Sequence, residues 1–242
     1  MSEQFPIIIN VRDRLSPLLL LLEWLESVGQ REIWLCDNAS TYPPMVDFLH
    51  STRHHVVLTK SNLGKRAPWL SGLVPEVGNG RFFVVTDPDV VPAQECPTDV
   101  LQFFKQSLQQ HPEINKIGFS LKIDDLPDHF NHKDSVIAWE SQFWTIPAFG
   151  AFYRAPIDTT FAMYPPGLGH GPHHLRSAPP YEARHLPWYQ NSSEPTQEDL
   201  YYARHSDSQI TNWNDDRIPA NVRATLRIQK ISQTPDKQRP AK

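Results

Sequence analysis

The stretch FPIIINVRDRLSPLLLLLEWLES, Phe5 to Ser27, changes its residue pattern once along its length. It opens with a continuous apolar run, Phe5–Val11, rich in β-branched residues and typical of a strand buried on both faces. A helical segment follows, and we expect Ser16 as its N-cap, Pro17 in its first turn and Gly29 at its end. The stretch therefore predicts a buried strand that leads directly into a helix.

The alternation of strands and helices continues through the first third of the chain. The sequence predicts a second buried strand over Glu32–Cys36, a helix around Pro44–His50, a third strand over His55–Lys60 and a fourth over Arg81–Thr86. This order predicts the α/β class, with a mostly parallel central sheet flanked by helices. Ligands of such sheets bind outside the carboxyl ends of the strands, so the polar residues that follow each strand are the candidate site.

The rest of the chain is rich in proline and predicts longer loops. Its expected elements are a helix, a strand, a helical piece and a strand-like stretch, over Thr98–Gln110, Asn115–Ile123, Ser135–Trp144 and Ala151–Tyr164. The segment Pro165–Pro187 is rich in Pro, Gly and His and has little periodicity. We expect a loop there, either a functional lid or an insertion without fixed structure.

Composition limits the class of protein. The chain has 242 residues, 39% of them hydrophobic, and a formal net charge of -4, which is typical of a globular protein and argues against a nucleic-acid partner. Cys36 and Cys96 lie far apart without metal-site spacing, which favours a reducing compartment and predicts a cytoplasmic protein. No secretory signal pattern is visible, and the longest apolar run, Leu18–Leu22, is shorter than the roughly 20 residues that span a bilayer.

Two carboxylates follow the fourth predicted strand. Asp87 and Asp89 flank Pro88, and in an extended chain residues i and i+2 point to the same side. Two close carboxylates repel each other unless a proton or a cation neutralises them. Oxygen ligands of this kind suit Mg²⁺ or Mn²⁺, whereas the alternative is an ordinary turn begun by Asp-Pro. Their place at the end of a buried strand favours the cation site.

Polar residues also follow the second and third predicted strands. Asp37 can accept a hydrogen bond from a ribose hydroxyl or a base imide, and the alternative is an Asx turn. Gly64 permits close approach of the backbone, and the adjacent Lys65 and Arg66 can neutralise a phosphate. The alternative for these two cations is a solvated basic turn.

Taken together, these segments resemble the GT-A-fold glycosyltransferases, and in particular the bacterial family 2-like nucleotide-sugar transferases. The resemblance rests on Asn-x-Arg-Asp, Asp-Asn-Ala-Ser-Thr, Ser-Asn-Leu-Gly and Asp-Pro-Asp, and it covers Pro6–Pro92 well. It implies a GT-A-like (Rossmann-like) fold with a loop-rich C-terminal acceptor part. It also implies transfer of a sugar from a UDP-, GDP- or dTDP-sugar to a hydroxyl of a glycan, polysaccharide or lipid-linked acceptor, with Mn²⁺ or Mg²⁺.

The same resemblance implies roles for individual residues. The nucleotide contacts would come from Arg12, Asp37, Lys65, Arg66 and Asp87. Asp37 would contact the base, Asp87 the ribose or the metal, and Asp89 the metal. His185 precedes Pro-Trp in ARHLPWY, which is similar to the His-and-Pro-Trp ending of some GT-A families and implies a third metal ligand. A His-rich zinc site is the competing interpretation, but it lacks the fixed spacing of zinc ligands.

An inverting transferase needs a carboxylate base for the acceptor hydroxyl. Asp158 is the preferred candidate because it follows a strand-like stretch, and Glu140, which lies among aromatic residues, comes next. Glu198-Asp199 resembles the Glu-Asp of family 2 enzymes but follows the expected metal histidine, and a helix N-terminus explains it equally well. A retaining enzyme would need no such base.

The expected organisation is one domain over 1–217, with a nucleotide-binding half over 5–92 and an acceptor half over 93–217. Residues 218–242 are basic and predict a disordered tail, a candidate for weak contact with an anionic membrane surface. Two alternative functions are a nucleotidyltransferase on a related fold and a non-catalytic nucleotide- or glycan-binding module. The first would be expected to have a Gly-rich loop after the first strand, and no glycine occurs over 10–15.

Overall fold

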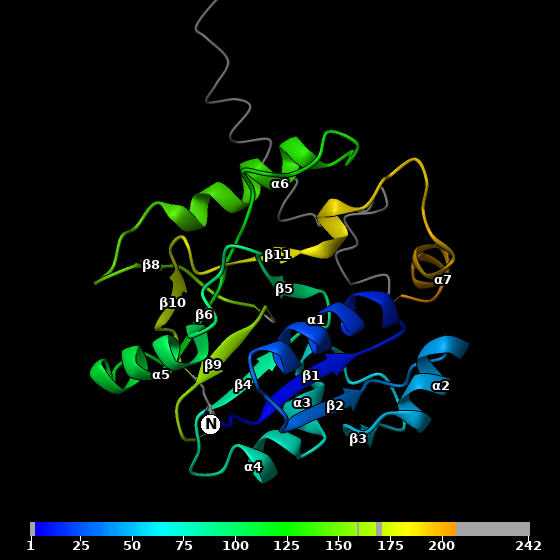
Figure 1. Ribbon diagram of the computed structural model, residues 1–242, viewed down its shortest axis with the longest axis horizontal. Coiled ribbons are helices and arrows are strands. Elements are labelled where there is room, and N and C mark those ends of the chain that lie inside the picture. The colour runs from blue at the N-terminus through cyan, green and yellow to red at the C-terminus, as the bar shows by residue number, and fades with distance from the viewer. Residues whose placement is uncertain (1–2, 159, 168–170, 207–242) are drawn as a thin grey trace, which may run out of the picture.

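The four strands of the N-terminal part form a parallel sheet. The computed structural model describes residues 3–158, 160–167 and 171–206. The strands are β1 (Ile7–Val11), β2 (Ile33–Asp37), β3 (His55–Leu58) and β4 (Phe83–Thr86). They are neighbours in the order β3-β2-β1-β4, and every pair is parallel. All four carboxyl ends therefore lie at one edge of the sheet (Figure 1).

Helices cover both faces of this sheet because its strands are apolar on both sides. Ile7 and Ile9 of β1 pack in one buried cluster with Leu21, whereas Ile8 belongs to a second cluster with Leu73. On the first face lie α1 (Leu15–Ser27) and α2 (Pro43–Ser51). On the second lie η1 (Gly64–Arg66), α3 (Ala67–Leu70) and α4 (Leu73–Val77). The predicted α/β fold with a helix-flanked parallel sheet is confirmed.

Four later strands extend the sheet beyond β4. The full order of the eight-stranded sheet is β3-β2-β1-β4-β9-β6-β10-β8. The added strands are β9 (Ala162–Tyr164), β6 (Lys116–Gly118), β10 (His174–Ser177) and β8 (Phe152–Arg154). β9 is antiparallel to both of its neighbours, β10 is parallel to β6, and β8 is antiparallel to β10. The sheet is thus mostly parallel, with two reversed strands in its second half.

A small second sheet stands beside the carboxyl edge. Its strands follow the order β5-β11-β7, where β5 is Val90–Pro92, β11 is Glu182–His185 and β7 is Ser120–Leu121.

Helix α5 (Val100–Gln110) packs on the large sheet. The remaining elements are α6 (Lys133–Glu140), η2 (Ser141–Trp144), η3 (Leu186–Tyr189) and α7 (Gln197–His205). Figure 1 places α7 beside α1 and α2, and α6 beyond β11.

Several sequence predictions for the second half are wrong. The loop expected over Pro165–Pro187 contains β10 and β11, because buried polar residues such as Arg176 break the apolar pattern of these strands. The single strand expected over Asn115–Ile123 divides at Phe119 between the two sheets. The stretch Ala151–Tyr164 likewise forms two separate strands, β8 and β9.

The helix start in the opening stretch also differs from the prediction. α1 begins at Leu15 and has no side-chain cap from its own N-cap residue, so Ser16 lies inside the helix. Cys36 and Cys96 are free and buried. No helix within the described ranges is long and apolar enough to cross a membrane. The tail expected over 218–242 lies outside the described residues.

Candidate nucleotide and metal site at the carboxyl edge

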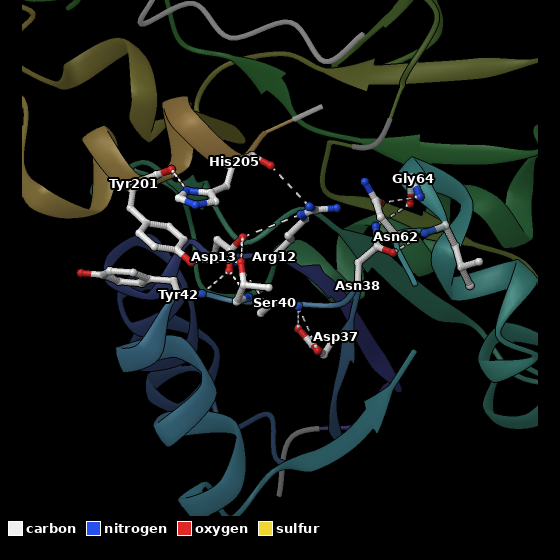
Figure 2. Close-up of polar contacts among 12 residues, drawn as sticks. Arg12, Asp13, Asp37, Asn38, Ser40, Tyr42, Asn62, Gly64, Tyr201 and His205 are labelled. Carbon is white, nitrogen blue, oxygen red and sulfur yellow. Dashed lines mark hydrogen bonds and ion pairs between the residues drawn. The ribbon is translucent and has the colours of Figure 1, made fainter. Parts of the chain in front are cut away.

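The candidate site lies where the loops that follow β1, β2, β3 and β4 meet. β1 lies between β2 and β4, because the chain runs outward from β1 to β2 and β3 and then crosses back to place β4 on the other side of β1. Such a switch in strand order opens a crevice at the carboxyl edge of the sheet. Figure 2 shows polar residues of the first three loops and the hydrogen bonds and ion pairs that join them, together with Tyr201 and His205 of α7.

Asp13 and Asp37 shape the two loops nearest to β1 and β2. Asp13, in a left-handed conformation with φ of 53°, is buried and accepts hydrogen bonds from the amides of Thr41 at 2.6 Å and Tyr42 at 2.7 Å. Asp37 accepts a bond from the amide of Ser40 at 3.2 Å, which is the Asx turn considered as the alternative (Figure 2). Burial raises the pKa of Asp37, while its bonds to Ser40 oppose the rise. Both carboxylates fix the backbone of the crevice wall.

Asn38 holds the loop after β3 against the same edge. Its side chain accepts a bond from the amide of Leu63 at 2.6 Å and donates to the carbonyl of Gly64 at 3.1 Å. Gly64 has a φ of 69°, a conformation that favours glycine. Lys65 and Arg66 follow it directly and are exposed. The structure thus brings these two cations to the carboxyl edge of the sheet, in the loop after β3.

Asp89 lies between a histidine and an arginine. Its Oδ1 is 3.8 Å from Nε2 of His185, and its Oδ2 is 3.8 Å from Nη2 of Arg14. The antiparallel pairing of His185 with Val90 and the bond from the amide of Leu186 to the carbonyl of Asp89 place the histidine there. Burial lowers the pKa of His185, which favours the neutral imidazole that a metal ion requires.

The donor set suits a divalent cation, although it is not a closed ligand cage. Within the described part of the chain, no group of three or more His, Cys, Asp or Glu side chains is arranged to hold a metal ion. Nδ1 of His185 is buried and has no hydrogen-bond partner among the described residues. Two carboxylates on one turn, with an imidazole nearby, are donors that fit Mn²⁺. The site therefore has suitable ligand types, with Asp89 and His185 3.8 Å apart, but no third ligand side chain grouped with them among the described residues.

Arg14 is a central residue that the sequence did not reveal. It is 4% exposed, and its Nη1 donates to Asp199 Oδ1 at 3.1 Å. Its guanidinium also lies 4.6 Å from the centre of the Tyr202 ring. Arg14 thus joins the turn after β4 to helix α7. No local pattern signals this role, because Arg14 and its partner Asp199 are 185 positions apart.

The pair Glu198-Asp199 has a structural role at helix ends. Glu198 accepts bonds from the amides of Leu15 at 3.1 Å and Ser16 at 3.0 Å, and so caps α1 from another helix. Asp199 forms a capping box with Thr196 at the start of α7 and also accepts from Arg14. Both are buried. The helix-terminus interpretation of this pair is the one that the structure supports.

Arg12 has unused donors at the same edge. Its Nη2 donates to the carbonyl of His205 at 3.4 Å (Figure 2). Its Nε and Nη1 are buried and have no hydrogen-bond partner among the described residues, although Nε lies 3.7 Å from Asp13 Oδ2. Buried donors of a guanidinium are costly to leave unpaired, so this position suits an anionic ligand.

The two candidate bases have different environments. Asp158 is 68% exposed, and its Oδ1 lies 2.8 Å from Nζ of Lys65, which links the segment before β9 to the loop after β3. Glu140 is 5% exposed and is paired with Arg176 at 2.8 Å. Burial raises the pKa of Glu140, and Arg176 opposes the rise. Glu140 lies in α6 and is buried together with Arg176, so its surroundings indicate a structural ion pair.

Comparisons with known proteins gave only structural similarities. No family model matches the sequence, and no curated protein matches it. The structure is similar to a 1–349 fragment of S. aureus TarS, with 14% identity, 53% of this chain and 39% of that chain covered, and a TM-score of 0.36. It is similar to HddC from Yersinia pseudotuberculosis complexed with GMP-PN, with 13% identity, 74% and 91% covered, and a TM-score of 0.43.

A third similar structure is the mannosyltransferase PcManGT from Pyrobaculum calidifontis in complex with GDP-Man and Mn²⁺. It is 15% identical, the match covers 96% of this chain and 77% of that chain, and the TM-score is 0.41. The chain spans well under half of the TarS fragment. These similarities are partial, so a functional assignment has to come from the site itself.

Proposed function

We propose that the chain is a nucleotide-sugar glycosyltransferase of the GT-A type, which transfers a sugar to a hydroxyl acceptor with the help of a divalent cation. The observation that carries the proposal is the position of Asp89 between His185 and Arg14 after β4, with the guanidinium of Arg12 after β1 at the same edge of the sheet. Carboxylates for a cation and guanidinium groups for a diphosphate are the chemistry that such a donor requires.

In the nucleotide-binding half, 5–92, different side chains bind the cation, the diphosphate and the base of the donor. Asp87 and Asp89, with His185, would hold Mn²⁺ or Mg²⁺, which when bound supplies Lewis-acid neutralisation of the leaving diphosphate. Arg12 binds a diphosphate oxygen through its guanidinium, whose Nη1 has no hydrogen-bond partner among the described residues, and Lys65 and Arg66 add positive charge from the loop after β3. Asp37 lies at the end of β2, where its carboxylate contacts the base.

In the acceptor half, 93–217, Asp158 takes the proton of the acceptor hydroxyl. Its carboxylate is exposed and reaches the basic loop of the nucleotide-binding half through Lys65. As the hydroxyl oxygen attacks the anomeric carbon, the bond from that carbon to the diphosphate breaks and the proton passes to Asp158. Because the diphosphate leaves in this single displacement, the configuration of the anomeric carbon is inverted. We also propose that the enzyme acts in the cytoplasm and that its acceptor is a glycan or a lipid-linked molecule.

The direct test is turnover of a panel of UDP-, GDP- and dTDP-sugars with Mn²⁺, measured as release of the nucleoside diphosphate. Asp89→Asn should lower the rate by about a hundredfold, because the neutral amide is a poor ligand. The control is Asp128→Asn, whose carboxylate is 98% exposed and paired with Lys133. Equal rates in Asp89→Asn and wild type would refute the site. Release of pyrophosphate from nucleoside triphosphates would instead indicate a nucleotidyltransferase.

A further inference from the structure

Three side chains hold three consecutive main-chain positions just before β9. Nε of Arg176 donates to the carbonyl of Pro156 at 2.9 Å. The amide of Ile157 donates to Nδ1 of His174 at 3.3 Å. Nζ of Lys116 donates to the carbonyl of Asp158 at 3.2 Å. Arg176 and His174 come from β10 and Lys116 from β6, so side chains of two neighbouring strands of the large sheet form hydrogen bonds to the main chain of residues 156–158.

Each of these three side chains is itself fixed by a second contact. Arg176 is paired with the buried Glu140 at 2.8 Å, and Nε2 of His174 bonds to the carbonyl of Gly171 at 2.7 Å. Lys116 also donates to the hydroxyl of Tyr164 at 3.3 Å. The two bonds of His174 require a proton on Nε2 and a free lone pair on Nδ1, which is one tautomer of the neutral ring.

The segment combines a fixed main chain with an exposed carboxylate. Ile157 is buried in the cluster that covers the second face of the sheet, whereas the Asp158 carboxylate is largely exposed beside Lys65. An exposed acid on a loop would ordinarily sample many positions. Here the backbone that carries it is tied to strands, which is how a reactive group is held within a narrow range of positions.

We infer that His174 and Lys116 are positioning residues, which set the Asp158 carboxylate toward the acceptor hydroxyl by holding the main chain of residues 157 and 158. The inference rests on the proposed function, in which Asp158 is the base. Neither side chain touches the reacting atoms, so each acts through Asp158 alone.

The bond from the Ile157 amide makes the arrangement sensitive to acid. A protonated imidazole has no lone pair to accept that bond. Burial lowers the pKa of His174, with a further lowering from Lys116 and His173, while the bond to Gly171 raises it. Arg176 is the other cation on the same strand, and Asp158 and Tyr164 are the titratable groups that face Lys116. The segment should therefore stay held at neutral pH and loosen as the pH falls through the pKa of His174.

The kinetic test compares three variants. His174→Leu removes the acceptor and should lower kcat by about tenfold to a hundredfold, with little change in the donor KM, because the misplaced base affects only the chemical step. His174→Asn offers an amide oxygen in a similar place, so it should retain most of kcat and lose the acidic inflection of His174 from the pH profile. The neighbouring His173→Asn should keep the wild-type kcat and retain the acidic inflection, shifted slightly to higher pH because His173 lowers the pKa of His174.

The structural test does not depend on turnover. Hydrogen exchange of the Ile157 amide, expressed as a protection factor, should fall with pH as His174 titrates in wild type. It should be low at every pH in His174→Leu and show no acidic step in His174→Asn. If the amide is equally protected in His174→Leu and wild type, the positioning role is wrong. If exchange changes as expected but no variant and no wild type turns over any nucleotide sugar, the proposed function fails and the positioning does not.

Discussion

At the scale of the residue, Arg14 organises the carboxyl edge more than any side chain predicted from the sequence. Its guanidinium contacts Asp89 after β4 and both Asp199 and Tyr202 of α7. It is buried, so each of these contacts lies largely out of water. An ion pair in such a place is costly to break, because the remaining carboxylate keeps its charge without a counter-ion.

We predict that Arg14→Gln lowers the free energy of unfolding by about 3 kcal/mol, since Asp199 then stays buried without its cation. Urea denaturation measures the change. The matched control is Arg53→Gln, because Arg53 is 72% exposed and pairs with Glu26 at the surface. That variant should lose less than about 1 kcal/mol. Equal losses in the two variants would show that the Arg14 network does not contribute to stability as described.

At the scale of the element, the hydrophobic pattern was a good guide where strands are buried on both faces. The runs that form β1, β2 and β4 are apolar and were predicted correctly, as was the parallel arrangement that gathers their ends. β10 and β11 escaped prediction because they contain Arg176 and Glu182, polar residues that are buried. Arg176 is compensated by Glu140, whose position in space no local pattern gives.

In the candidate site, too, some residues were predicted from the sequence and others were not. Arg12, Asp37, Lys65 and Asp89 were predicted to lie at strand ends, because the rule for parallel sheets needs only the order of the elements. Arg14, His174 and Lys116 were not identified, since their partners come from elsewhere in the fold. Glu198 was considered as a base but caps α1, a role that depends on where α7 packs.

The cap of α1 can be tested at the same scale. Glu198→Ala should lower the free energy of unfolding by about 2 kcal/mol, because the amides of Leu15 and Ser16 lose their acceptor. Hydrogen exchange of these two amides should rise together with the loss. The control is Glu194→Ala, since Glu194 is exposed and pairs only with Asn191 in the described bonds. Unchanged exchange at Leu15 and Ser16 in Glu198→Ala would contradict the cap.

At the scale of the whole molecule, stability should depend on pH through Lys116. Burial lowers the pKa of Lys116 to about 8, from 10.5 in an exposed lysine. Between these two values the unfolded chain binds a proton that the folded chain does not, so stability rises with pH across that window. The gain is at most about 3 kcal/mol.

The measurement is the free energy of unfolding from pH 7 to 10.5 in wild type and in Lys116→Met. Other titrating groups are shared by the two proteins and cancel in the difference. The wild type should gain stability relative to the variant as the pH rises above about 8. Parallel curves would show that the lysine keeps an ordinary pKa in the folded protein.

The central claim concerns one crevice that binds a nucleoside diphosphate and a divalent cation together. Titration calorimetry of UDP, GDP and dTDP, with and without Mn²⁺, tests it most directly. We expect one of the three to bind with Mn²⁺ and to bind at least about tenfold more weakly without it or in Asp89→Asn, while Asp128→Asn binds as wild type. The claim would be contradicted by the absence of binding with Mn²⁺, or by equal binding in Asp89→Asn and wild type.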